Sequence, residues 1–154
     1  MIQRHGWILL FHDYIVEQLQ KLHAATERAE PSEPQGYQSN ANVKLFRALT
    51  HLILEVVPSD PGRDQYRQGK TLGPDHRHWR RATIGRRFRL FFCYDSRSRT
   101  IVFACVNDEQ TLRSSGSKFD PYAMFEKMLR PGHPPDDWKS LVAASRSDWS
   151  VHEK

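Results

Sequence analysis

The pattern of apolar and polar residues along this chain predicts four β-strands. The first is a continuous apolar run over residues 6–12, which is typical of a buried strand. Three more strands are predicted over residues 79–84, 87–94 and 100–106, with a hairpin turn over residues 95–99. Because residues 100–106 are almost entirely apolar, we expect that strand in the centre of the sheet.

Helical spacing of apolar residues predicts two helices between the first and second strands. One covers about residues 14–29, with Asp13 as its expected N-cap. The other begins at Asn40 or at the serine before it, and we expect Pro58 and Pro61 to end it. Residues 30–38 contain proline, serine and glycine, which indicates a linker between the two helices.

The C-terminal third predicts two shorter helices. Asp120 followed by proline is a typical helix start, and a later proline–glycine pair stops this helix. Asp136 and Asp137 favour the start of a last helix, and residues from about 147 are expected to form a flexible tail. The elements together predict one α+β domain over residues 1–154, with N-terminal helices packed on a small, antiparallel-rich sheet and further helices at the C-terminus.

The composition is that of a soluble globular protein. Of its 154 residues 38% are hydrophobic and 27% charged, and no run of 18 apolar residues is present to span a membrane. The apolar run near the N-terminus is too short for a secretory signal, so we expect a cytoplasmic protein with no membrane partner. Cys93 and Cys105 lie in apolar strands without a CxxC spacing, and we expect them to be small core residues.

Positive charge is concentrated in the predicted strands. The chain has a net charge of +5, while residues 77–113 contain nine arginines and only three acidic residues. Arg87 and Arg89 alternate with apolar residues in one strand, and Arg80 and Arg81 lie in the strand before it. Since like charges on paired strands repel, the cluster indicates an anionic partner, most commonly nucleic acid. For any single arginine, a solvated sheet face explains the pattern equally well.

Trp79 and the pair His76 and His78, all near the arginines, each allow a structural as well as a functional interpretation. Trp79 can stack on a nucleic-acid base or pack in the core. His76 and His78 lie two residues apart and could be two metal ligands, but they do not form a four-ligand zinc motif. We therefore expect no metal site.

Several longer motifs are recognisable from residue 66 onward. They are YRQGKTLG at residues 66–73, RFRLFF at 87–92, VNDEQTLR at 106–113 and RPGHPPDDW at 130–138. With these motifs the chain resembles the RelE superfamily of toxin endoribonucleases, and within it the YhaV group, over nearly its whole length. The resemblance implies a RelE-like fold.

The resemblance also implies a function and partners. It implies a toxin of a type II toxin–antitoxin system that cleaves messenger RNA, typically at the ribosome, without a metal or other cofactor. It further implies a cognate antitoxin of the AbrB type, and repression of their own promoter DNA by the toxin–antitoxin complex. The chain departs from many RelE members at residues 107–109, where Asn-Asp-Glu replaces a basic segment.

RNA cleavage without a metal uses the 2′-hydroxyl as the nucleophile, and it needs charge stabilisation at the phosphate and proton transfer. Arginine stays protonated, so it suits a phosphate clamp and not a general base. We assign Arg81 and Arg89 to the scissile phosphate, and Lys70 and His133 to proton transfer. The expected substrate contacts are Arg80, Arg87, Arg113 and Trp79.

Two other functions of the same basic sheet stay open at this point. One is a non-catalytic module that binds nucleic acid or an acidic segment of an antitoxin. The other is a structural partner whose arginines pair with a second subunit.

Overall fold

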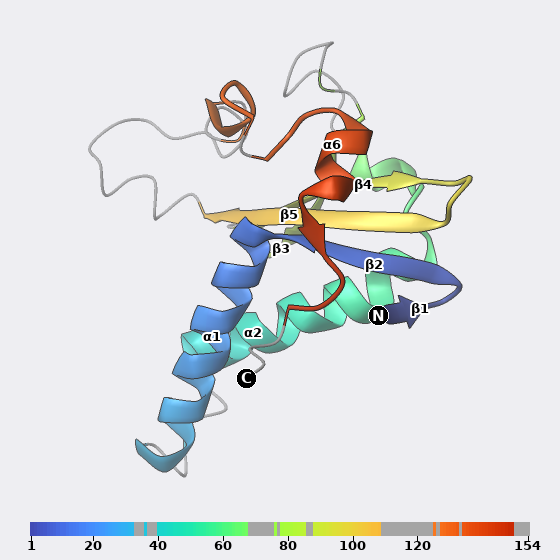
Figure 1. Ribbon diagram of the computed structural model, residues 1–154. Helices are drawn as coiled ribbons and strands as arrows, with labels where there is room; N and C mark the ends of the chain where they lie inside the picture. Colours follow the sequence, from blue (N-terminus) through green and yellow to red (C-terminus); the bar gives the residue numbers. More distant parts are fainter. Residues whose placement is uncertain are drawn as a thin grey trace.

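A computed structural model describes residues 1–32, 36, 40–67, 76, 78–85, 88–108, 125, 127–132 and 134–149. The strands are β1 (Ile2–Arg4), β2 (Trp7–His12), β3 (Arg80–Ile84), β4 (Phe88–Asp95), β5 (Thr100–Asp108) and β6 (Ser145–Arg146). The helices are α1 (Asp13–Ser32), α2 (Ala41–His51), the π-helix η2 (Leu52–Val56), α3 (Val57–Ser59), the 3₁₀ turn η3 (Asp64–Tyr66) and α6 (Trp138–Ala143). Figure 1 shows α1 and α2 on one side of the sheet and α6 on the other. The predicted α+β class is confirmed.

One mixed sheet connects all six strands, in the order β1-β2-β5-β4-β3, with β6 also paired to β2. Only the β2–β5 pair is parallel among these described strands. The central place expected for residues 100–106 is confirmed, because β5 lies between β2 and β4. Strand β1 was not predicted. It pairs with β2 through a tight turn at His5 and Gly6, whose φ values are 53° and 80°.

The face of the sheet toward α1 and α2 carries the larger core. Leu9, Phe92 and Phe103 from the sheet pack there against Ile15 and Leu49 from the helices, and all five are fully buried. Burial of this apolar area is the main force that holds the two layers together.

A side-chain amide fixes the register of α1 on β5. Gln18 Nε2 donates to the Val106 carbonyl oxygen at 2.7 Å, and Gln18 Oε1 accepts from the Val106 N–H at 2.9 Å. This pair of bonds anchors the end of β5, where the chain leaves the sheet.

The opposite face carries a smaller core beneath the C-terminal segment. Trp79 and Phe91 pack there with Phe125, whose ring stacks on Phe91 at 4.2 Å between centroids. Leu141 brings α6 onto the same cluster. Cys93 also belongs to it and, like Cys105, is buried and free, so the expectation of two core cysteines is confirmed.

Two helix boundaries, both of α1, differ from the prediction. Asp13 is the first residue of α1 and not its cap, because the Tyr14 N–H donates instead to His12 Nδ1 at 3.2 Å. The helix also runs through Pro31 to residue 32 instead of ending near 29. The second helical run passes through the wider turns of η2 and ends at Ser59, between Pro58 and Pro61, as predicted.

Other helix starts agree with the prediction. The Asn40 side chain accepts from the N–H groups of residues 42 and 43, and the Asp137 side chain caps α6 by accepting from the Ser140 N–H at 3.0 Å. Phe125 and residues 127–129 are helical, while the start predicted at Asp120 lies outside the described residues.

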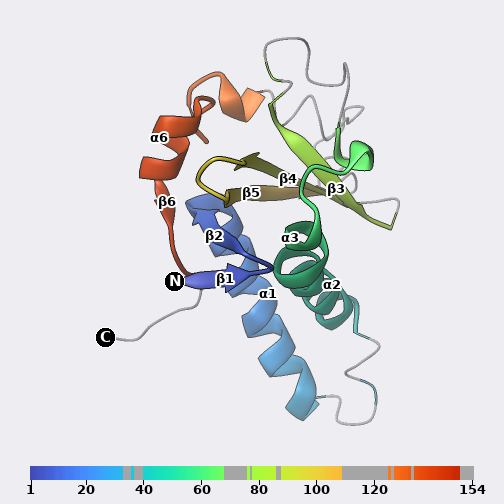
Figure 2. The ribbon, with the colours of Figure 1, turned by 90° about the vertical axis from the view of Figure 1, so that its right-hand side faces the viewer.

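The prediction of a flexible tail from about residue 147 is wrong for residues 147–149, because Trp149 is packed. Figure 2 shows β6 carrying the chain from α6 past β2 toward the helical layer. There the Trp149 ring packs edge-on against Phe46, and its carbonyl oxygen accepts from Gln20 Nε2 at 3.4 Å. Residues 150–154 lie outside the described part of the chain.

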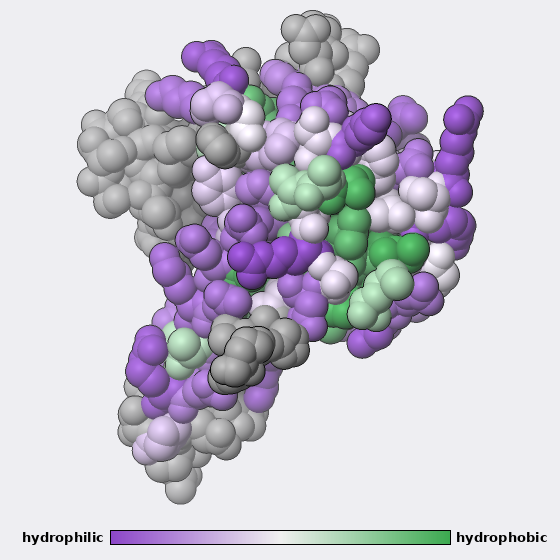
Figure 3. Space-filling view, viewed as in Figure 1, coloured by the Kyte–Doolittle hydropathy of each residue, from purple (hydrophilic) through white to green (hydrophobic). Residues whose placement is uncertain are grey.

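The surface is polar over most of the face shown in Figure 3, and its apolar residues gather between α6 and β2. Within the described ranges, no helix is both long enough and apolar enough to cross a membrane.

Candidate functional site: an arginine face and a histidine–aspartate cluster

The two arginines assigned to the phosphate clamp lie on the same face of the sheet. In the pairing of β3 with β4, Arg81 is opposite Phe91 and Arg89 is opposite Thr83; Arg89 also faces Asn107 of β5. Directly opposite residues share a sheet face, so Arg81, Thr83, Arg89 and Asn107 form one surface, which we call the arginine face. Arg81 and Arg89 are diagonal neighbours on it, a relation that separates two Cα atoms by about 7 Å.

Backbone oxygens orient both guanidinium groups of the arginine face. Arg81 Nη1 donates to the Gln65 carbonyl oxygen at 2.7 Å, and Arg89 Nη1 donates to the Phe88 carbonyl oxygen at 3.2 Å. Both side chains are half-buried. A guanidinium has five N–H donors in a fixed plane, so it can hold a carbonyl and a phosphate oxygen together.

Arg80 does not belong to the arginine face. It is opposite Phe92 in the β3–β4 pairing, and its guanidinium lies over the Tyr94 ring at 5.5 Å. Both Phe92 and Tyr94 pack in the core toward α1 and α2. The structure therefore separates Arg80 from Arg81, although the sequence pattern grouped them.

Four of the predicted site residues cannot be placed relative to this surface. Lys70, Arg87, Arg113 and His133 lie outside the described residues. Their predicted roles stay predictions.

Trp79 is not available as a substrate contact in this structure. Its side chain is 0% exposed, and its ring packs edge-on against Phe125 at 4.9 Å between centroids. Its indole Nε1 donates to Asp136 Oδ1 at 2.8 Å. A base cannot stack on a ring that is enclosed on all sides, so the expected stacking role is wrong for this conformation.

The Asp136 carboxylate contacts three side chains just before β3, those of His76, His78 and Trp79. Asp136 Oδ1 accepts from Trp79 and also lies 3.0 Å from His78 Nε2, while Asp136 Oδ2 lies 3.0 Å from His76 Nδ1. His78 Nε2 is in addition 2.7 Å from the Asp136 carbonyl oxygen. These contacts join segments 57 to 60 residues apart in the chain, and we call the four residues the Asp136 cluster.

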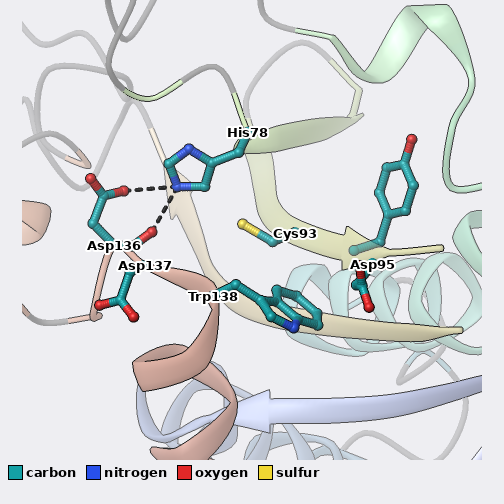
Figure 4. Close-up of a pocket in the computed structure, with 7 residues that line it drawn as sticks. His78, Cys93, Asp95, Asp136, Asp137 and Trp138 are labelled. Carbon is teal, nitrogen blue, oxygen red and sulfur yellow. Dashed lines mark hydrogen bonds and ion pairs between the residues drawn. The ribbon is translucent and has the colours of Figure 1, made fainter. Parts of the chain in front are cut away.

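A pocket with a volume of about 370 Å³ opens beside the Asp136 cluster. Figure 4 shows His78 and Asp136 on one side of it and Trp138 on the other, with Cys93 from β4 between them. The pocket lies where β4 continues past the start of β3, because residues 93–95 have no partner in the β3–β4 pairing. Asp95, Asp137 and Tyr94 complete the lining.

The other ionisable groups in this pocket have structural roles. Hydrogen bonds from the Ser98 hydroxyl and N–H lower the pKa of Asp95, and hydrogen bonds from Ser140 lower the pKa of Asp137. Burial raises the pKa of the Cys93 thiol well above its ordinary value. A thiol in this state stays protonated, which makes it a poor nucleophile.

The Asp136 cluster was not predictable from the sequence. His76 and His78 were noted as a pair, but their partner comes from the RPGHPPDDW segment more than 50 residues later. No sequence signal links the two segments, because only the fold brings them together. In the described part of the chain, no group of three His, Cys, Asp or Glu side chains is arranged to hold a metal ion.

An α+β protein with two arginines on one sheet face and a histidine–aspartate cluster at the start of β3 is suited to act on a polyanion. Comparison with known proteins defines the class further. Residues 9–146 match the family model of YhaV toxins, described as toxins with endonuclease activity of toxin–antitoxin systems. Because the match covers most of the chain, the protein belongs to this family, and the predicted resemblance is confirmed.

Individual relatives agree with this assignment. Toxin YhaV of Escherichia coli O6:H1 is 39% identical over 140 residues, which are 90% of this chain and 91% of the relative. The protein named ribonuclease toxin YhaV in Escherichia coli K12 is 38% identical over the same shares of both chains. No solved structure matches this protein significantly.

Proposed function

We propose that this protein is the ribonuclease toxin of a toxin–antitoxin system and that it cleaves messenger RNA by attack of the 2′-hydroxyl on the neighbouring phosphate, without a metal. The observation that supports this most is that Arg81 and Arg89 are diagonal neighbours on one sheet face. Family membership supplies the nuclease activity, and the name of the K12 relative supports RNA as the substrate.

In this mechanism the arginine face stabilises the charge that develops on the phosphate. Arg81 and Arg89 bind its non-bridging oxygens, and the transition state gains more from these bonds than the ground state does. Arg87 and Arg113 add substrate contacts, and Lys70 and His133 take part in proton transfer. These four assignments rest on the sequence, since the residues lie outside the described part of the chain.

The cellular context follows from the same family. We propose cleavage at the ribosome, inhibition by an AbrB-type antitoxin, and binding of the complex to its own promoter DNA. Cleavage assays on purified RNA with and without ribosomes test the first point. Co-purification with the antitoxin, followed by promoter binding with toxin, antitoxin or both, tests the others.

The clamp has a direct test. Purified Arg81→Ala and Arg89→Ala proteins are expected to cleave RNA at least about 100-fold more slowly than the wild type, since removal of one transition-state donor costs this much in other enzymes. Arg97→Ala, in the exposed turn between β4 and β5, removes the same charge away from the arginine face and serves as the control. If both clamp variants are folded and as active as the control, the clamp is wrong.

A further inference from the structure

The arginine face lacks a group that can accept a proton, because arginine stays charged at every pH of interest. The described residues next to it in the chain include a histidine in a suitable arrangement. His78 lies three residues before Arg81, on the chain that enters β3. Three residues of chain span at most about 10 Å, a gap that the long Arg81 side chain can bridge, so both side chains can reach the ribose and phosphate of one nucleotide.

The partners of His78 determine which ring nitrogen carries the proton. Nε2 faces the Asp136 carboxylate at 3.0 Å and the Asp136 carbonyl oxygen at 2.7 Å. Both partners are acceptors, so Nε2 must be the N–H donor in the neutral ring. The other nitrogen, Nδ1, is then unprotonated and can accept a proton.

Nδ1 is also accessible. It forms no hydrogen bond with any residue in the described ranges, and Figure 4 shows it on the side of the ring away from Asp136. The His78 side chain is 44% exposed and lines the pocket of about 370 Å³. Because the ring is this exposed, a reacting hydroxyl can approach it from solvent.

His76 is less suitable for this role. Its side chain is only 18% exposed, and its Nδ1 is the atom that faces Asp136. Asp136 itself is held by Trp79 Nε1, so the carboxylate is fixed by a buried ring when it orients His78. In the Asp136 cluster, the buried Trp79 therefore holds Asp136, and Asp136 in turn holds the exposed His78.

We infer that His78 is the general base of RNA cleavage and that Asp136 is its positioning residue. His78 Nδ1 removes the proton of the 2′-hydroxyl, and the 2′-oxygen bonds to phosphorus. The bond from phosphorus to the 5′-oxygen breaks, and this oxygen receives a proton from water, in the transfer step assigned above to Lys70 and His133. The hydroxide that remains takes the proton of the imidazolium. The products are a 2′,3′-cyclic phosphate and a 5′-hydroxyl end.

The inference rests on the proposed ribonuclease function and adds the residue that starts the reaction. His78→Gln is the first variant, because its amide can still donate to Asp136 but has no basic nitrogen. We expect kcat for RNA cleavage to fall at least about 100-fold with KM within twofold, as is usual when a general base is lost. His23→Gln is the matched control, since it changes another exposed histidine beside a carboxylate, at 3.8 Å from Glu27.

A second variant separates a chemical role from a structural one. His78→Ala is expected to regain at least about tenfold of the lost activity when imidazole is added, since a free base can enter the vacated space. Imidazole should not change the activity of the wild type or of His23→Gln. Thermal unfolding of every variant shows that the loss is not one of folding.

The outcomes separate this inference from the proposed function. If wild-type protein does not cleave RNA with or without ribosomes, the proposed function is wrong. If the wild type cleaves and folded His78→Gln keeps its kcat, or if imidazole fails to restore His78→Ala, the base is another group and the inference is overturned while the ribonuclease function stands.

Discussion

Arg80 and Arg81 are neighbours in the chain, but their side chains lie on opposite faces of the sheet. Arg80 stacks over Tyr94 on the side covered by α1 and α2, while Arg81 lies on the arginine face with Arg89. A charge count along the sequence cannot separate them, whereas the alternation of side chains along a strand does.

This separation predicts different effects for the two substitutions. Arg81→Ala should reduce RNA cleavage at least about 100-fold with little change in stability. Arg80→Ala should lower the free energy of unfolding by about 1 kcal/mol, from loss of the cation–π contact, and should leave kcat within about threefold. Cleavage rates and urea unfolding of both variants test this, and equal loss of activity in folded proteins would contradict it.

The buried indole of Trp79 predicts a stability effect without a binding effect. Trp79→Phe keeps an aromatic ring against Phe125 but removes the bond to the Asp136 carboxylate, so we expect a loss of about 2 kcal/mol. KM for RNA should stay within twofold, because the ring contacts no substrate. Trp149→Phe is the control, with an expected loss below about 1 kcal/mol. A large rise in KM for Trp79→Phe would restore the stacking role.

The capping carboxylate of α6 predicts a pH dependence of stability. Hydrogen bonds from Ser140 lower the pKa of Asp137 in the folded state, so the unfolded state binds its proton more readily. The stabilisation is complete well above the ordinary value of 3.8 and is lost as the pH falls through the lowered pKa of the folded state. Thermal unfolding between about pH 6 and 3 should show a flatter acid dependence for Asp137→Ala than for the wild type.

A matched variant makes this comparison specific. Asp64→Ala removes a carboxylate that is 97% exposed and lies 3.9 Å from Arg67 Nε. Its melting temperature should follow the wild-type pH profile. Parallel profiles for Asp137→Ala and the wild type would show that the cap does not carry the acid dependence.

The two buried cysteines predict slow reaction with thiol reagents. Burial raises the pKa of both Cys93 and Cys105, and the thiolate is the reactive form. In the native protein, modification by an aromatic disulfide reagent should be at least about 100-fold slower than in 6 M guanidinium, where both thiols are exposed. Rapid native labelling of Cys93, which lines the pocket, would show that the pocket opens further than this structure indicates.

Much of the fold was predictable because it depends on local patterns. The runs of apolar residues located β2, β3, β4 and β5, and the caps Asn40 and Asp137 marked the starts of their helices. The short strands β1 and β6 were missed, since three or two residues carry no periodicity of their own. Trp149 likewise gave no sequence signal for its packing on Phe46, which depends on contacts with distant residues.

By itself, the sequence determined the α+β class, the cluster of arginines and the resemblance to the YhaV family, because each depends on residue order and spacing. Only the tertiary structure decided which arginines share a face, that Trp79 is core, and that Asp136 meets His78. The reason is physical: a strand sends neighbouring side chains to opposite faces, and a hydrogen bond across 58 residues exists only once the layers have packed.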